Sequence, residues 1–149
     1  MNTSKPIACI SYNSTDFLNM TLKQLHELHI ISDYMYIYHK HEEDEKKDHI
    51  HLWLKPNTKV DTIELQNRFK ELDPNFDKPL GITDPKSSDI DNWLLYSQHF
   101  KPYLISKLED RVYYYQKSDF VYCDEDTFEE NYYHAFHSSD WAKQKKHNA

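Results

Sequence analysis

Two histidines separated by one residue, His49 and His51, are the side chains whose type and spacing most directly suggest chemistry. They belong to the run His-Ile-His-Leu-Trp-Leu at residues 49–54, in which every second residue is Ile or Leu. Successive side chains of a β-strand point to opposite faces of the sheet, so both imidazoles should share one face with Trp53 while the isoleucine and leucines face the core. Two imidazoles held side by side in this way are suited to binding one divalent cation.

A third imidazole and several carboxylates lie close by in the sequence. The apolar, tyrosine-rich run at residues 36–39 ends at His39, which would arrive beside His49 and His51 if the two runs pair as a hairpin. Imidazole suits Zn, Cu, Fe and Ni, and an added carboxylate with open water positions suits Mn or Mg. The alternative is a set of solvent-facing histidines on a half-buried sheet, without a metal.

The elements that would position these histidines follow the order β-α-β-β-α-β. Strands are predicted at residues 6–12, 30–39 and 49–55 and within 77–83, and helices at 16–28 and 60–72. This order is typical of the split βαβ, ferredoxin-like arrangement, an α+β fold whose central antiparallel sheet carries two helices on one face. We expect the other face to be free for a ligand, and residues 1–149 to form one domain.

A third helix is predicted at residues 89–99, after a start that is similar to a capping box. Its apolar residues cluster on one side, whereas Tyr96 and His99 fall on the other. A tyrosine on the polar face of a helix, close to a histidine, is not where a core tyrosine is expected. The remaining predicted elements are a last strand at residues 112–116, a turn at 118–119 and a terminal helix at 125–137, before a frayed basic end.

Composition excludes several classes of protein. With 38% hydrophobic and 29% charged residues the chain is predicted to be globular and soluble, and no apolar run approaches the roughly 18 residues that a membrane helix needs. A single glycine leaves no Gly-rich loop for nucleotide phosphates. Cys9 and Cys123 are far apart and not in a metal-binding spacing, so we expect free thiols and a cytoplasmic protein.

The net charge of −7 counts against nucleic-acid binding, because contacts with phosphates usually supply most of the affinity. The charge is unevenly distributed, however, with much of the acid at residues 42–48 and 119–130. A mostly basic segment contains Lys101, Lys107, Arg111 and Lys117. The average charge therefore weakens the case for a DNA-binding protein without deciding it.

Three sequence blocks span most of the chain. They are His-Lys-His-Glu at residues 39–42, His-Ile-His at 49–51, and Tyr-Ser-Gln-His at 96–99 followed by Tyr-Gln-Lys-Ser-Asp-Phe at 115–120. The array resembles the HUH endonucleases, in particular the single-tyrosine rolling-circle replication initiators of small plasmids and phages, with their H-x-x-[D/E], HUH and Y-x-x-H motifs. The order of the blocks and the predicted scaffold agree with this resemblance.

The resemblance implies an enzyme that nicks and rejoins single-stranded DNA at a replication origin and so initiates rolling-circle replication. It implies that Mn²⁺ or Mg²⁺ is held by His39, Glu42, His49 and His51. It also implies that Tyr96 attacks the scissile phosphate and stays covalently attached to the 5′ end, with His99 as an auxiliary residue. Tyr103 is the alternative nucleophile.

Several ligands and contacts are open to alternatives. Glu43, Asp44 and His41 are alternatives to Glu42 as the fourth metal ligand. His41 would also replace His39 if the strand register differed by two. The expected DNA-binding residues are Trp53, Lys101, Lys107, Arg111 and Lys117. The expected partners are single-stranded DNA at an origin hairpin and the replication machinery of a bacterial host, and no membrane.

Two other functions compete with this one. A non-catalytic module that binds single-stranded nucleic acid has the same order of elements and stacks bases on aromatic residues of its sheet. Its usual aromatic-glycine signature strands do not occur here, so it ranks second. An acidic protein-interaction module is supported only by the net charge and the acidic residues at 119–130.

Overall fold

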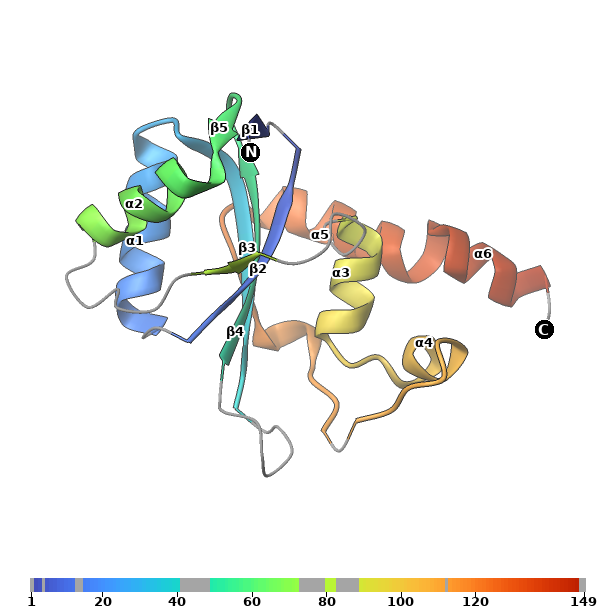
Figure 1. Cartoon of the computed structure of the whole chain (residues 1–149). Coiled ribbons are helices and arrows are strands. Elements are labelled where there is room, and N and C mark those ends of the chain that lie inside the picture. The colour runs from blue at the N-terminus through green and yellow to red at the C-terminus, as the bar shows by residue number, and fades with distance from the viewer. Residues whose placement is uncertain are drawn as a thin grey trace.

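A five-stranded antiparallel sheet forms the centre of the protein, with helices on both of its faces (Figure 1). Its strands are β2 (Ile7–Ser11), β3 (Ile31–His39), β4 (His49–Pro56), β6 (Gly81–Ile82) and β7 (Phe120–Tyr122), in the order β6-β2-β4-β3-β7. A separate ribbon pairs β1 (Asn2–Thr3) with β5 (Val60–Asp61). The computed structural model describes residues 2–3, 5–12, 15–40, 49–72, 80–82, 89–111 and 113–147.

The helices follow or separate these strands. They are α1 (Thr15–Glu27), α2 (Thr62–Leu72), α3 (Ile90–Ser97), α4 (Lys101–Ser106), α5 (Glu125–Tyr133) and α6 (Asp140–His147). A 3-10 turn, η2 (Lys117–Asp119), precedes β7, and a π-helical segment, η3 (His134–Ser138), follows α5. Within the described ranges, no helix has both the length and the apolar character needed to cross a membrane.

The first part of the chain has the predicted β-α-β-β-α-β order and the strand arrangement of a split βαβ unit. β2 and β3 are joined through α1, and β4 lies between them, antiparallel to both. β6, which follows α2, pairs with the other edge of β2. The predicted α+β class, an antiparallel sheet with helices packed on it, is therefore confirmed, and β7 extends the sheet beyond the predicted strands.

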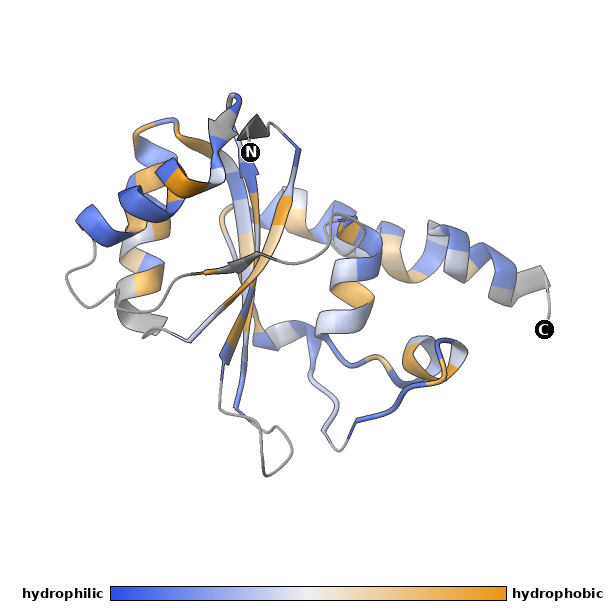
Figure 2. Ribbon diagram, in the orientation of Figure 1, coloured by the Kyte–Doolittle hydropathy of each residue, from blue (hydrophilic) through white to orange (hydrophobic). Residues whose placement is uncertain are grey.

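One face of the sheet packs against α1 and α2. The strands contribute alternate apolar residues to this face, among them Ile50, Leu52 and Leu54, which are completely buried. The helices contribute apolar residues three or four positions apart, the spacing that places side chains on one helical face. These are Leu18, Leu22 and Leu25 of α1, and Leu65 and Phe69 of α2. The hydropathy colours in Figure 2 show apolar positions on both helices and along the strands.

The opposite face, which we expected to be free for a ligand, is covered over much of its length. Met35, Ile37 and Trp53 on this face pack with side chains of α3, α5 and η3, so the prediction of an open face is wrong. The physical reason is that these strand residues are themselves apolar, and burying them is favourable by roughly 25 cal/mol per Å². At the end of the β3–β4 hairpin, histidines occupy the corresponding positions instead.

Two predictions for the C-terminal part of the chain are corrected. Residues 113–116, the described part of the predicted last strand, do not form a strand. The Tyr115 amide instead donates to the Gln98 carbonyl at 3.0 Å, which ties this segment to the end of α3. The strand that joins the sheet is β7, and the basic end that we expected to be frayed contains α6. The predicted turn at 118–119 and the terminal helix correspond to η2 and to α5 with η3.

Leu52 tests the packing of the sheet against α1 and α2. Leu52→Ala truncates a fully buried side chain and should lower the free energy of unfolding by roughly 2–5 kcal/mol, because it leaves a cavity in the core. Chemical denaturation followed by circular dichroism measures this change. Ile63→Ala, at an exposed position of α2, is the matched control and should change stability by less than about 0.5 kcal/mol. Equal losses in the two variants would contradict the placement of Leu52 in the core.

Candidate metal centre

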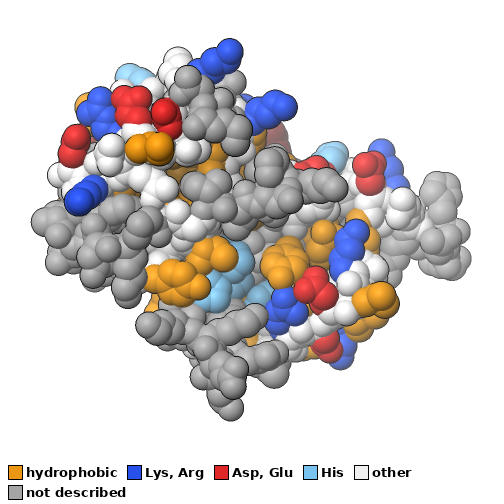
Figure 3. All heavy atoms as spheres, in the orientation of Figure 1, with side chains coloured by type: hydrophobic (Ala, Val, Ile, Leu, Met, Phe, Trp, Pro, Cys, Tyr) orange, Lys and Arg blue, Asp and Glu red, His pale blue; other side chains and the backbone are white. Residues whose placement is uncertain are grey.

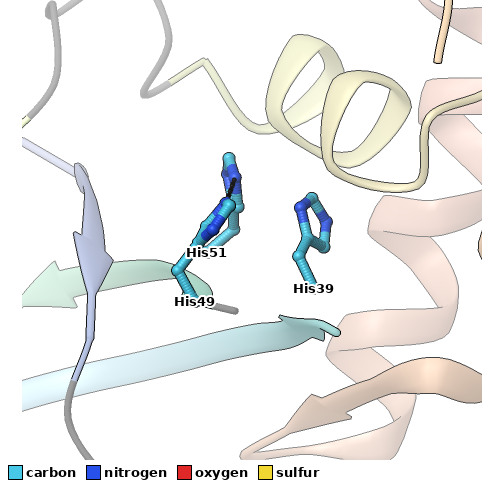
Figure 4. A group of neighbouring side chains, drawn as sticks. All are labelled: His39, His49 and His51. Atoms are coloured by element: carbon cyan, nitrogen blue, oxygen red, sulfur yellow. Dashed lines mark hydrogen bonds between the residues drawn. The ribbon is translucent and has the colours of Figure 1, made fainter. Parts of the chain in front are cut away.

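Three imidazoles meet at the end of the β3–β4 hairpin (Figure 4). In the register of the two strands His39 lies directly opposite His49, and Ile37 lies opposite His51. All three histidines project from the same face of the sheet, toward α3. One ring nitrogen from each lies within 4.8 Å of the others, so the predicted hairpin and the predicted meeting of the three side chains are confirmed.

The spacing of the ring nitrogens fits a single cation. The Nε2 atoms of His49 and His51 are 3.1 Å apart. Adjacent ligand atoms around one ion are separated by about 3.0 Å in octahedral coordination with bonds of about 2.1 Å, and by about 3.4 Å around tetrahedral zinc. The observed separation lies between these values, and transition-metal ions accept imidazole ligands. The residues present therefore fit a divalent metal, and metal binding itself stays a prediction.

His39 is the most constrained of the three side chains. It is completely buried, and its Nε2 donates a hydrogen bond to the Ser97 carbonyl oxygen at 2.6 Å. Nδ1 is then the nitrogen that carries the lone pair, and a hydrogen bond from the opposite nitrogen is how proteins commonly orient a metal-binding imidazole. Burial lowers the pKa of His39 far below its usual range, and the nearby His51 and His99 lower it further. His39 is therefore neutral near pH 7, the form that binds metal.

The predicted carboxylate ligand lies outside the described residues. Glu42 and its rivals His41, Glu43 and Asp44 all belong to residues 41–48, which connect β3 to β4. The oxygen ligand of the site therefore stays a prediction.

α3 ends against the histidine cluster, and its last turn carries Tyr96. The helix ends at Ser97, two residues earlier than predicted, as the chain turns at His99, which has a left-handed backbone with φ of 56°. His99 is buried, its ring centroid lies 4.6 Å from that of His39, and its Nδ1 donates to the Tyr113 carbonyl at 2.9 Å. The prediction that His99 lies on an exposed helical face is wrong: the turn brings it next to a candidate metal ligand.

A guanidinium holds the hydroxyl of Tyr96. Arg111 Nη2 donates to Tyr96 Oη at 2.7 Å, and the guanidinium carbon lies 5.6 Å from the centre of the Tyr96 ring. Tyr96 is half-buried, and the carbonyl of the next residue, Ser97, accepts the hydrogen bond from His39. The backbone of Tyr96 is thereby fixed close to the histidines, while a positive charge at Oη stabilises negative charge on that oxygen.

The Arg111 guanidinium is itself oriented by contacts with the two preceding residues, one through a side chain and one through the backbone. Its Nη2 also donates to Glu109 Oε1 at 3.3 Å, and its Nη1 donates to the Asp110 backbone carbonyl at 2.7 Å. Burial acts to lower the pKa of Arg111, but Tyr96 and Glu109 outweigh it, so the pKa is raised and the guanidinium stays charged. The basic segment predicted from the sequence thus supplies one fixed cation to Tyr96.

Tyr103, the alternative nucleophile, lies in a different environment. It is buried, packs edge-on against Trp141, and donates from its hydroxyl to Asn92 Oδ1 at 3.1 Å. Burial raises the pKa of Tyr103, which makes its phenol harder to deprotonate. Asn92 precedes Ser97 by five residues, a rise of roughly 7 Å along a helix. Tyr96 differs from Tyr103 in that the residue after it, Ser97, contacts a histidine of the cluster.

The other residues predicted to contact DNA are dispersed. Trp53 shares the histidine face but is buried, so its ring has little surface available to DNA. Lys101 and Lys107 each extend over a tyrosine ring, 5.7 and 5.5 Å from its centre. Lys117 lies in η2 and forms an ion pair with Glu129 of α5, which offsets its charge. Arg111 is the member of this set that contacts Tyr96.

Two aromatic residues of the site have no role predicted from the sequence. Tyr115 stacks on His39, with ring centroids 4.5 Å apart and an angle of 8° between the planes. Tyr12 lies beside His49, with ring centroids 5.7 Å apart. The signal for Tyr12 is strand alternation: Ile10 pairs with His51, so the residue two positions later continues on the same face toward His49. No comparable pattern points to Tyr115, because its segment is not a strand.

The site is accessible from outside. Figure 3 shows pale-blue histidine atoms at the surface of one face of the molecule, with orange side chains of the hydrophobic class on either side. His51 is the partly exposed member of the three, whereas His39 is completely buried.

No known protein-family model matches the sequence, and no curated protein matches it either. The functional interpretation therefore depends on the geometry of the site.

Thermal unfolding in the presence of Mn²⁺ tests the metal site without any assay of activity. An ion that binds only the folded protein stabilises it by about 2.7 kcal/mol at 100 times its Kd. Mn²⁺ should therefore raise the Tm of the wild type in a concentration-dependent way, and His51→Ala should abolish that rise. His26→Ala, at an exposed position near the end of α1, is the matched control and should keep the full response. The same response to Mn²⁺ in His51→Ala as in the wild type would contradict the site.

Proposed function

We propose that the protein is a metal-dependent endonuclease and strand transferase that nicks single-stranded DNA at a replication origin through Tyr96 and so initiates rolling-circle replication. The observation that carries the proposal is the junction between the histidine cluster and the end of α3, made by the hydrogen bond from His39 to Ser97. Cleavage by a tyrosine requires a charge-stabilising centre for the phosphate and an activated phenol near it. This hydrogen bond joins the histidine cluster to the turn of α3 that carries Tyr96, which supports a phosphate-binding centre and a phenol at the same end of the sheet.

The histidines are the metal-binding part of this proposal. His39, His49 and His51 would hold Mn²⁺ or Mg²⁺, and Glu42, or one of its rivals Glu43 and Asp44, would complete the ligand set. When bound, the ion supplies Lewis-acid polarisation of the scissile phosphate. Both ions favour oxygen ligands, which is why the proposal needs a carboxylate and water positions beside the three imidazoles. The Ser97 carbonyl contributes by holding His39 in the tautomer that presents Nδ1.

Tyr96 is the nucleophile. Its Oη forms a bond to phosphorus while the bond from phosphorus to the 3′ oxygen breaks. The phenolic proton leaves to water, and the departing oxygen gains a proton, so the products are a free 3′-OH and a strand joined to Tyr96 through its 5′ phosphate. Arg111 stabilises the negative charge that develops on Oη before the attack, because its Nη2 already donates to that atom. The phosphodiester is conserved in the covalent link, so the reverse reaction rejoins strands without ATP.

The proposal also defines a cellular setting. The substrate is an unpaired strand at an origin hairpin, and the replication machinery of a bacterial host would extend the released 3′ end. The protein would act in the cytoplasm. Its two cysteines agree with a reducing compartment, since neither forms a disulfide and burial raises the pKa of the Cys9 thiol to about 12.

Tyr96→Phe tests the nucleophile. In the presence of Mn²⁺ the wild type should cleave members of a random-sequence single-stranded DNA library and migrate with a covalently attached strand on a denaturing gel. Tyr96→Phe keeps the ring but lacks Oη, so it should form no such adduct while retaining DNA affinity. Tyr103→Phe is the matched control and should form the adduct.

The opposite pattern has a clear meaning. An adduct that survives in Tyr96→Phe and disappears in Tyr103→Phe would contradict the assignment of the nucleophile. DNA binding without any adduct in the wild type would favour the non-catalytic nucleic-acid-binding module instead.

Arg111→Gln tests the activation of the phenol. Removing the charged donor should slow adduct formation by roughly 100-fold, the size of effect seen when one preorganised donor to a developing negative charge is lost. Arg68→Gln, the same substitution at an exposed position of α2, should leave the rate unchanged. An undiminished rate in Arg111→Gln would exclude the proposed role.

A further inference from the structure

Aromatic rings form a continuous row across the histidine cluster. From the end of β2 to the segment before η2, the row consists of Tyr12, His49, His39, Tyr115 and Tyr113. Consecutive ring centroids are 5.7, 5.4, 4.5 and 4.8 Å apart. The order follows from the sheet, in which β4 lies between β2 and β3. The candidate metal centre therefore lies in the middle of the row, with a tyrosine at each end.

The two outer rings differ from the inner ones in exposure. Tyr12 is 46% exposed and Tyr113 is 38% exposed, whereas the inner rings are buried. Neither outer ring is stacked in parallel on its inner neighbour: the planes of Tyr12 and His49 make an angle of 50°, and those of Tyr113 and Tyr115 make 66°. Each end of the row thus presents aromatic surface to solvent next to the centre.

We propose that Tyr12 and Tyr113 are stacking platforms for two unpaired DNA bases, one on each side of the phosphate that lies at the histidines. The inference rests on the proposed function, which it extends by naming how the substrate strand is held. Stacking on an aromatic ring tolerates any base, because every base has a flat π face. The two tyrosines therefore bind the strand by stacking on its bases, and they favour unpaired over paired DNA.

An unpaired strand is the occupant whose chemistry matches the row. A strand presents bases on either side of an anionic phosphate, and the row presents a ring, a cation-binding centre and a second ring. In a duplex the faces of each base are already stacked on neighbouring bases, so the tyrosines would have nothing to contact. An apolar peptide has no anionic group to lie at the centre.

Cationic groups lie at the Tyr113 end of the row. Arg111 is two residues from Tyr113 in the chain, and Lys101 Nζ lies 5.7 Å from the centre of the Tyr114 ring. The acidic residues of this segment are engaged: Glu109 accepts from Arg111, and Asp110 accepts from the Tyr114 hydroxyl at 2.6 Å. The two positive and two negative charges of this segment cancel, so it does not repel a phosphate backbone as the negative total of the protein would.

Fluorescence anisotropy with a labelled dT12 oligonucleotide tests the proposal. The measurement is made with EDTA and without metal, so it does not depend on nicking. A 12-nucleotide abasic strand, which has the same phosphates and no bases, is the second probe. The wild type should bind dT12 more tightly than the abasic strand. Tyr12→Ala and Tyr113→Ala should each weaken dT12 binding by roughly 5- to 150-fold, the range for losing one stacked base, and should leave abasic binding unchanged.

The controls separate stacking from folding. Tyr12→Phe and Tyr113→Phe keep the rings and should bind dT12 as the wild type does, because stacking does not need the hydroxyl. Tyr133→Ala removes a tyrosine that is 63% exposed on α5, outside the row, and should also bind normally.

Two results would overturn the proposal: equal affinity of the wild type for dT12 and the abasic strand, or dT12 binding that is unchanged in both alanine variants. Neither result would decide the outcome of the nicking assay with Tyr96→Phe, which tests the proposed function separately. If the protein nicks DNA but shows no base-dependent binding, only the role of Tyr12 and Tyr113 is refuted.

Discussion

The buried hydrogen bond between the His39 ring and the Ser97 carbonyl connects the end of β3 to the end of α3, across 58 residues of sequence. Its length of 2.6 Å and its burial make it costly to leave unmade, since both groups would lose hydrogen bonds to water without replacement. The same contact sets the tautomer of His39 and fixes the backbone of Tyr96, which precedes Ser97. The geometry of the candidate metal centre and the position of the candidate nucleophile therefore depend on one interaction.

Electrostatics explains why this end of the sheet suits a cation. Burial disfavours a charge on His39, and the neighbouring His51 and His99 disfavour it further. His39 is thus kept in the neutral state that offers a lone pair. Protons and metal ions compete for the same nitrogen, so an imidazole that stays unprotonated near pH 7 is prepared for a metal. Tyr115 covers His39 from the other side and limits its contact with water.

Features that depend on neighbouring residues could be predicted from the sequence, whereas features that depend on distant segments of the chain could not. Strand alternation correctly predicts that His49 and His51 share a face, and element order correctly predicts the split βαβ unit, because both depend on neighbouring residues. The helices that cover the second face of the sheet could not be predicted, since α3 and α5 return to the sheet from far along the chain. Helical periodicity placed His99 on an exposed face, but a left-handed residue at that position ends the helix and buries its ring. The contact between Arg111 and Tyr96 comes from a segment without regular structure, for which no pattern exists.

We propose that three imidazoles and one phenol converge on a single cation-binding space. A crystal structure of the protein grown with Mn²⁺, with anomalous data collected at the manganese edge, tests this convergence. We expect one strong anomalous peak bonded to a ring nitrogen of each of His39, His49 and His51, with the Tyr96 hydroxyl facing the same space. A map without a peak at these histidines, or with Tyr96 Oη directed away from the ion, would contradict it.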